Sequence, residues 1–97
     1  MQLILYSKPG CHLCEGLQAK LEQIVGTRKF PSLQIEVRDI TVREDWFAAY
    51  QYEVPVLCRN RAGKEEQLPR PSPRASVQQL EKMLQQYVED GMLNVEG

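Results

Sequence analysis

A strand, a turn and the start of a helix follow one another in the stretch Leu3-Ile4-Leu5-Tyr6-Ser7-Lys8-Pro9-Gly10-Cys11-His12-Leu13-Cys14. Residues 3–6 are apolar and predict a buried strand, whereas residues 7–10 have the composition of a turn. The two cysteines are three positions apart, which is about one helical turn, and they open an amphipathic pattern. The stretch therefore predicts a close thiol pair at the N-terminus of a helix.

Such a position changes the chemistry of the first thiol. The N–H groups of a first helical turn lack intrahelical partners, and the helix dipole adds partial positive charge there. Both effects stabilise a thiolate at Cys11, so we expect its pKa to lie below that of a free thiol. A thiolate attacks disulfides, and Cys14 would then resolve the mixed disulfide. The pattern predicts a dithiol thiol–disulfide oxidoreductase with a redox-active Cys11–Cys14 pair.

Length and composition indicate one globular domain over residues 1–97, with 42% hydrophobic and 26% charged residues. The net charge is -1 and the pI about 5.8, which favours neither nucleic acid nor an anionic membrane as a partner. No apolar stretch is long enough to span a bilayer, and the first residues do not resemble a signal peptide. One close cysteine pair plus an odd Cys58 is typical of a reducing compartment. We expect a cytoplasmic monomer.

Periodicity places the next elements. A helical apolar stripe follows the cysteine pair, with Gly26 as its end. Residues 33–37 alternate, which predicts a strand with one buried face. Thr41 and Glu44 match a capping box for a second helix that ends near residue 50. The stripe consists of Leu13, Leu17, Leu21, Ile24 and Val25, and the second helix is expected to bury Val42, Trp46 and Ala49 or Tyr50.

The second half of the chain predicts a hairpin and a last helix. Residues 54–58 and 65–68 read as strands joined by a turn at residues 61–64. Three prolines then impose an extended connector, in which Ser72 and Pro73 suit the N-cap and first position of a helix. The order β-α-β-α-β-β-α predicts an α/β fold: a four-stranded mixed sheet with helices on both faces. The last helix is expected to bury Val77, Leu80, Met83, Leu84, Tyr87 and Val88 and to end at Gly91.

The string Tyr6-Ser7-Lys8-x-x-Cys11-x-x-Cys14, together with Val54-Pro55 before the third strand, is similar to the glutaredoxin signature within the thioredoxin fold. The resemblance covers nearly the whole chain in element order. It implies Cys11 as nucleophile, Cys14 as resolving thiol and Lys8 as a cation near the thiolate. It also implies a cis bond at Pro55, with the Val54 backbone pairing to the substrate. Lys8, His12, Val54 and Pro55 are thus the expected substrate- or glutathione-binding residues.

Two departures mark a divergent, bacterial-type glutaredoxin-like branch. Glutaredoxins have Cys-Pro-Tyr-Cys where this chain has Cys11-His12-Leu13-Cys14. The region at residues 63–71 lacks the Gly-Gly pair and acidic residue that hold the γ-glutamyl group of glutathione. The resemblance therefore supports the chemistry more than glutathione as a partner. We expect no bound cofactor, a disulfide-containing protein or low-molecular-weight substrate, and either glutathione or a thioredoxin-type reductase as reductant.

Other interpretations remain beside this one. The same pair can act as a redox-responsive switch on a binding module, as a structural pair, or as part of an iron–sulfur carrier. A closed zinc site needs about four ligands, and only His12 and Cys58 remain, so no metal is expected. His12 either tunes the pair as a cation or is a neutral, exposed side chain. Lys8 either supports the thiolate or is a solvated turn residue.

Cys58 and four aromatic residues each have a structural and a functional interpretation. Cys58 lies in an apolar strand, where a buried inert thiol is usual and a regulatory thiol is the alternative. Four aromatic residues in and after the second helix either pack in the core or form a patch that faces the substrate. We expect core packing to account for most of them. They are Trp46, Phe47, Tyr50 and Tyr52.

Overall fold

The computed structural model of the chain describes the backbone of residues 2–96 and the side chains of residues 2–87. Its elements follow the predicted order β-α-β-α-β-β-α, with one added turn of 3-10 helix before α2. They are β1 (Gln2–Ser7), α1 (His12–Gly26), β2 (Gln34–Asp39), the 3-10 helix (Ile40–Val42), α2 (Glu44–Tyr50), β3 (Val56–Arg61), β4 (Lys64–Gln67) and α3 (Val77–Glu96).

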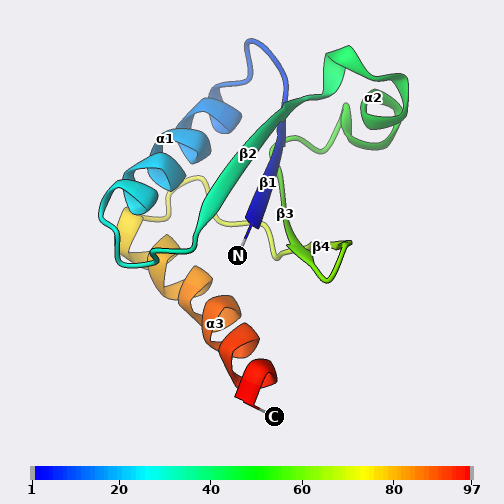
Figure 1. Ribbon diagram of the computed structural model, residues 1–97. Helices are drawn as coiled ribbons and strands as arrows, with labels where there is room; N and C mark the ends of the chain where they lie inside the picture. The colour runs from blue at the N-terminus through cyan, green and yellow to red at the C-terminus, as the bar shows by residue number, and fades with distance from the viewer. Residues whose placement is uncertain (1, 97) are drawn as a thin grey trace.

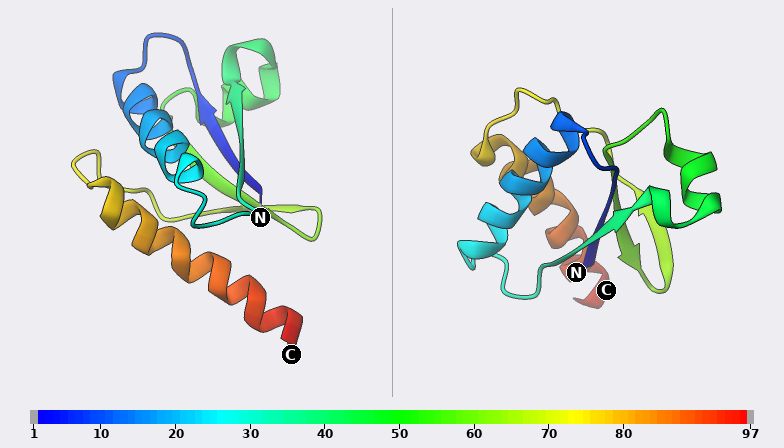
Figure 2. Two further views of the ribbon diagram at one scale, coloured as in Figure 1. Left: turned by 60° about the vertical axis from the view of Figure 1, so that its left-hand side comes forward. Right: turned by 90° about the horizontal axis from the view of Figure 1, so that it is seen from above.

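The four strands form one mixed sheet in the order β2-β1-β3-β4. Strand β1 pairs parallel with β2 and antiparallel with β3, and β4 pairs antiparallel with β3. Helices α1 and α3 cover one face of the sheet and α2 lies on the other, as the views in Figure 1 and Figure 2 show. The architecture predicted from the sequence, a four-stranded mixed sheet with helices on both faces, is confirmed (Figure 1, Figure 2).

Strand β1 has apolar side chains on both faces because both faces are covered. Leu3 and Leu5 point into the core beneath α1 and α3, whereas Ile4 and Tyr6 point toward α2. This alternation divides the core into two parts. The larger part contains Leu3, Leu5, Leu21, Ile24, Leu33, Leu57, Leu68, Leu80 and Leu84; the smaller contains Ile4, Tyr6, Ile40, Val56 and Cys58.

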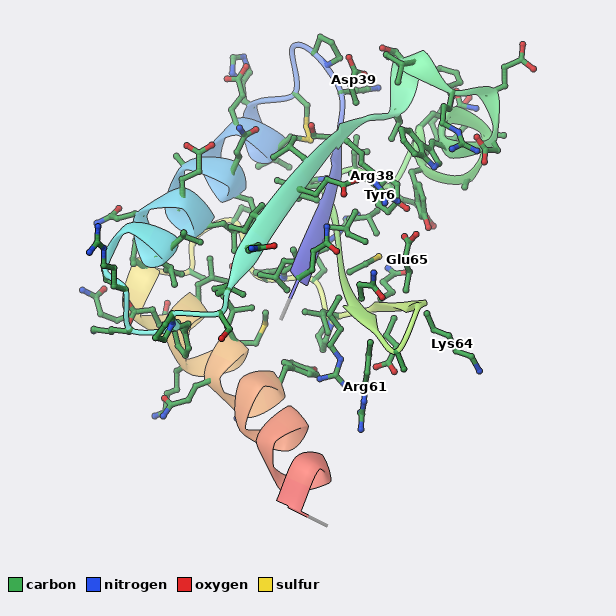
Figure 3. The ribbon with its side chains drawn as sticks, viewed as in Figure 1. Tyr6, Arg38, Asp39, Arg61, Lys64 and Glu65 are labelled. Carbon is green, nitrogen blue, oxygen red and sulfur yellow. A yellow bond between two sulfur atoms is a disulfide. The ribbon has the colours of Figure 1, made fainter. Side chains whose placement is uncertain are left out.

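The smaller core part ends in a polar network that joins three strands (Figure 3). The Tyr6 hydroxyl donates to the carboxylate of Glu65 on β4, and Arg38 Nη1 on β2 donates to the Tyr6 oxygen at 2.8 Å. Arg38 also lies over the Trp46 ring, 5.2 Å from its centroid. Burial, together with the hydrogen bond to Glu65, raises the pKa of Tyr6 to about 12. Tyr6 is therefore a neutral donor that connects the two edge strands.

Helix α2 does not begin with the predicted capping box. The Asp39 carboxylate accepts hydrogen bonds from the Thr41 N–H and hydroxyl at 2.9 and 2.6 Å, and so caps the 3-10 helix instead. Arg43 occupies the N-cap position of α2 and makes no side-chain cap. The prediction at Thr41 is wrong because the Thr41 hydroxyl donates to Asp39 and residue 41 lies inside the 3-10 turn, two residues before the N-cap of α2.

Helix α3 begins four residues later than predicted, at Val77. Ser76 is its cap: the Gln79 N–H donates to Ser76 Oγ at 3.1 Å, and the Ser76 N–H donates to Gln79 Oε1 at 2.8 Å. Ser72 instead caps a turn, because its Oγ accepts from the Arg74 N–H at 3.2 Å. The helix runs past the predicted end at Gly91 to Glu96, and the side chain of Val88 lies outside the described residues.

Several predicted burials are also wrong. Val37 is 40% exposed because β2 is an edge strand, and Val42 is 69% exposed because it belongs to the 3-10 turn. Phe47 and Tyr52 lie outside the core, although Trp46 and Tyr50 pack against it as expected. Leu13 is exposed too, and of the two alternatives Ala49 and Tyr50 it is Tyr50 that packs against the core. Within the described part of the chain, no helix is long and apolar enough to cross a membrane.

Candidate active site

Cys11 and Cys14 form a disulfide at the N-terminus of α1, with their Cα atoms 5.2 Å apart. Cys11 is the N-cap residue, with the extended backbone (φ −88, ψ 104) that this position requires. Its Sγ accepts a hydrogen bond from the Cys14 N–H at 3.2 Å. One of the unpaired donors of the first helical turn is thus directed at the sulfur of Cys11.

The turn before the pair fixes where Cys11 lies. The Cys11 N–H donates to the Lys8 carbonyl at 3.3 Å, which closes a tight turn between strand and helix. Gly10 has φ +79 in this turn, a conformation that L side chains rarely adopt. The pair is therefore held at the carboxyl end of the central strand β1.

The two sulfurs differ in access. Cys11 is partly exposed, whereas Cys14 is only 2% exposed beneath the first turn of α1. An incoming disulfide can therefore reach Cys11, while Cys14 is shielded from it. This asymmetry is what a nucleophile and a resolving thiol need.

Lys8 lies beside the pair, and its one described hydrogen bond is made elsewhere. Its Nζ donates to the carbonyl of Gln51 at 3.4 Å, which connects the active-site turn to the loop after α2. A carbonyl does not neutralise the ammonium. Lys8 also borders a small cavity of about 240 Å³ together with Cys14 and Asp39. Its charge is thus near the disulfide without direct contact.

The His12 side chain is exposed to solvent next to Glu15. Its side chain is 96% exposed, and Nδ1 lies 3.8 Å from a carboxylate oxygen of Glu15. This position agrees with the second of the two interpretations of His12, that of an exposed side chain.

Val54 and Pro55 precede β3 and border the site. Their peptide bond is cis, as the resemblance to glutaredoxins implied. Pro55 is buried and lines a groove with His12 and Leu13, so it lies beside the N-terminus of α1. The Val54 N–H donates to the Tyr50 carbonyl at 3.1 Å. Pro55 thus comes from a distant segment to lie beside the stretch that carries Lys8, His12 and the disulfide.

Cys58 does not belong to this site. It lies in the smaller core part on the α2 side of the sheet and is 3% exposed. Burial raises the pKa of the thiol above its ordinary value, which makes a thiolate unfavourable. The prediction of a buried thiol is confirmed. Among the described residues, no group of three or more His, Cys, Asp or Glu side chains is placed to hold a metal ion.

No motif in the sequence predicted a role for two basic residues that border the site. Lys20 on α1 and Arg70 in the proline-rich connector border the same groove as Leu13 and Pro55. They are 50 positions apart in sequence, and only the packing of the connector against α1 brings them together. The Ser76-x-x-Gln79 cap, in contrast, matches the capping-box pattern and was detectable from the sequence.

Residues 2–85 match the family model described as Glutaredoxin-like domain (DUF836). The chain belongs to this glutaredoxin-like family. Its fold and its close Cys11–Cys14 pair indicate a thiol redox function. Comparison with curated proteins returns no match.

Two solved structures resemble this glutaredoxin-like domain. One is thioredoxin 1 from the thermophilic eubacterium Thermosipho africanus TCF52B, with a TM-score of 0.60 and 20% identity over 94% of this chain and 98% of that chain. The other is the structural genomics target protein XcR50 from X. campestris, with a TM-score of 0.50 and 30% identity over 74% of this chain and 87% of that chain. The first supports the fold alone.

Proposed function

We propose that this glutaredoxin-like domain is a dithiol thiol–disulfide oxidoreductase. The Cys11 thiolate attacks one sulfur of a substrate disulfide, forms a mixed disulfide and releases the other sulfur as a thiolate. The Cys14 thiolate then attacks Cys11 Sγ, which re-forms the Cys11–Cys14 disulfide and releases the second substrate thiolate. Two electrons pass from the dithiol to the substrate, and each released thiolate takes a proton from solvent.

The unequal access of the two sulfurs carries this proposal. Cys11 is reachable at the helix N-terminus, and Cys14 is buried next to it within bonding distance. The Cys14 N–H and the helix dipole favour negative charge on Cys11 Sγ. They stabilise the reduced form and make Cys11 a good leaving group in the resolving step.

The Val54 main chain is the proposed contact for the substrate's backbone. Pro55 has no N–H, and Val54 lies two residues before the start of β3. An extended substrate segment would donate an N–H to the Val54 carbonyl, because the Val54 N–H already donates to Tyr50, while its cysteine faces Cys11. Lys8 adds positive charge to the same region and is proposed to support the thiolate.

The oxidised pair needs a reductant, either glutathione or the dithiol of a thioredoxin-type reductase. The region at residues 63–71 lacks the Gly-Gly pair and acidic residue that hold the γ-glutamyl group in glutaredoxins, which makes glutathione the weaker candidate. One close cysteine pair plus an odd, buried Cys58 is typical of a reducing compartment, and we propose the cytoplasm.

A turnover assay with two reductants tests the function. Reduction of insulin and of hydroxyethyl disulfide is followed with glutathione plus its reductase, and separately with thioredoxin reductase. We expect turnover with at least one of the two. Cys11→Ser should abolish it, whereas Cys14→Ser should stop at a mixed disulfide that mass spectrometry detects.

The same assay separates catalysis from a redox switch. A switch would oxidise and reduce its cysteine pair once, without repeated turnover of substrate. Absence of turnover with both reductants, in a protein whose Cys11 still reacts with an alkylating agent, would contradict the enzyme and favour the switch.

A further inference from the structure

A groove begins next to the disulfide and runs between the first two turns of α1 and the connector before α3. Its volume is about 170 Å³. Its walls are mainly apolar and include Leu13, Leu17, Pro55, Pro71 and Pro73. Leu13 is 53% exposed and immediately precedes Cys14. An apolar side chain from a ligand held at Cys11 would find buried surface here.

Two cations border this groove, and both are held by neutral groups. Lys20 Nζ donates to the carbonyls of Pro73 at 3.1 Å and Ala75 at 2.6 Å. Arg70 Nη2 donates to the carbonyl of Glu53. These bonds fix both side chains in place without neutralising their charge. No ion pair among the described residues involves either cation, and no described lining residue is acidic.

The start of α3, close to this groove, is capped by two of its own side chains. The Gln79 N–H donates to Ser76 Oγ, and the Gln79 side chain returns to the Ser76 N–H. This reciprocal cap uses backbone donors that would otherwise be open to a ligand's carboxylate. The charged groups that line the groove itself are the side chains of Lys20 and Arg70.

We propose that this groove selects protein substrates in which the reactive cysteine is flanked by an apolar residue and then by an acidic residue. The apolar side chain enters the groove beside Leu13, and the carboxylate meets Arg70 and Lys20. The proposal rests on the proposed thiol–disulfide exchange and adds its substrate class. The disulfide bonds that form and break, and the two electrons transferred, are those of that exchange. Glutathione or a reductase dithiol then restores the reduced Cys11–Cys14 pair.

The test uses short cysteine peptides in mixed disulfide with thionitrobenzoate. Attack of pre-reduced Cys11 on the peptide sulfur expels the coloured thionitrobenzoate anion and bonds the peptide to Cys11, from which Cys14 then releases it as a thiol. Four peptides combine leucine or serine next to the cysteine, on both sides, with glutamate or lysine beyond. The glutathione–thionitrobenzoate disulfide and hydroxyethyl disulfide are run in parallel.

We expect the leucine–glutamate peptide to react about tenfold faster than the serine–lysine peptide, with both positions contributing. Arg70→Gln should remove most of the preference for glutamate over lysine and leave the preference for leucine. Leu13→Gln should remove most of the preference for leucine over serine and leave the preference for glutamate over lysine. Lys64→Gln, on the β3–β4 hairpin away from the groove (Figure 3), is the matched charge control and should change neither preference.

Two results would overturn the proposal. One is equal rates for the four peptides, and the other is a glutathione disulfide that reacts faster than all of them. In both cases exchange at Cys11 would still be demonstrated. If no disulfide reacts, hydroxyethyl disulfide included, the proposed function itself fails and this inference fails with it.

Discussion

At the residue scale, Lys8 contributes one charge next to the disulfide while its hydrogen bond is made with the Gln51 carbonyl. These two contributions can be separated by substitution, because glutamine keeps a donor for the carbonyl and loses the charge. An exposed or partly exposed charge of this kind is worth only about 0.5 kcal/mol. Its effect on Cys11 is therefore modest and measurable.

Lys8→Gln should raise the pKa of Cys11, because the positive charge that favours the thiolate is removed. The rate of Cys11 alkylation, followed against pH in the reduced protein, measures this pKa. Below the pKa we expect alkylation to be about twofold slower than in the wild type. Lys64→Gln controls for the loss of one net charge. An unchanged pKa would leave Lys8 as a solvated turn residue.

Glu65 provides a pH dependence of stability at the same scale. The hydrogen bond from the Tyr6 hydroxyl, with support from Arg38, holds the pKa of this carboxyl below its ordinary value. A lowered pKa in the folded state stabilises the fold above the pKa of the unfolded state. This contribution is lost as the pH falls through the folded-state pKa.

Glu65→Gln should therefore flatten the decline in unfolding free energy below about pH 5. The effect should stay under about 1 kcal/mol, because the Glu65 side chain is 40% exposed and water screens the pair. Urea unfolding at several pH values measures it. Glu22→Gln, at an exposed position on α1, is the control, and an equal flattening in that variant would contradict the assignment to Glu65.

At the element scale, helix ends are decided by a few backbone donors and by which side chain reaches them first. Asp39 accepts the Thr41 N–H and caps the 3-10 helix before α2, and Ser76 accepts the Gln79 N–H and caps α3. Thr41 and Ser72, the two predicted caps, each have another residue nearby that can also cap a helix, namely Asp39 and Ser76. Competition among such neighbours, within about four residues, explains why the element types were right and these boundaries were wrong.

Ser76→Ala should destabilise the protein by about 1 kcal/mol, because the Gln79 N–H loses its acceptor at the start of α3. Ser72→Ala is the natural comparison, since Ser72 caps only a turn, and it should cost less than half as much. Chemical denaturation of the two variants measures the difference. A larger loss for Ser72→Ala would mean that the connector, and not α3, depends on its serine.

At the scale of the whole molecule, β1 connects the two core parts and carries the active-site turn at its end. Helix α1 presents Leu21 and Ile24 to the larger part, where both are fully buried. The position of Cys11 therefore depends on the packing of α1 against the sheet. The same packing brings the connector, with Arg70, over the first turns of α1.

Leu21→Ala should cost about 2–5 kcal/mol, because the cavity it leaves lies between α1, the sheet and α3. Val42→Ala is the control, and its cost should stay within about 0.5 kcal/mol because Val42 is 69% exposed. Thermal or urea unfolding of the two variants measures both costs. Similar values for the two would show that α1 is not packed as described.

The amino-acid sequence by itself determined the order of the elements, the mixed sheet, the buried Cys58 and the thiol pair at the start of α1. These features depend on periodicity and on residues within one or two turns of each other, which are visible along the chain. Only the tertiary structure decided the exposure of Val42 and Tyr52, the direction of Lys8 toward Gln51, and the groove with its two cations. These depend on contacts between distant segments, such as that of Lys20 with Ala75, 55 positions apart, and the position of such segments in space is set by core packing.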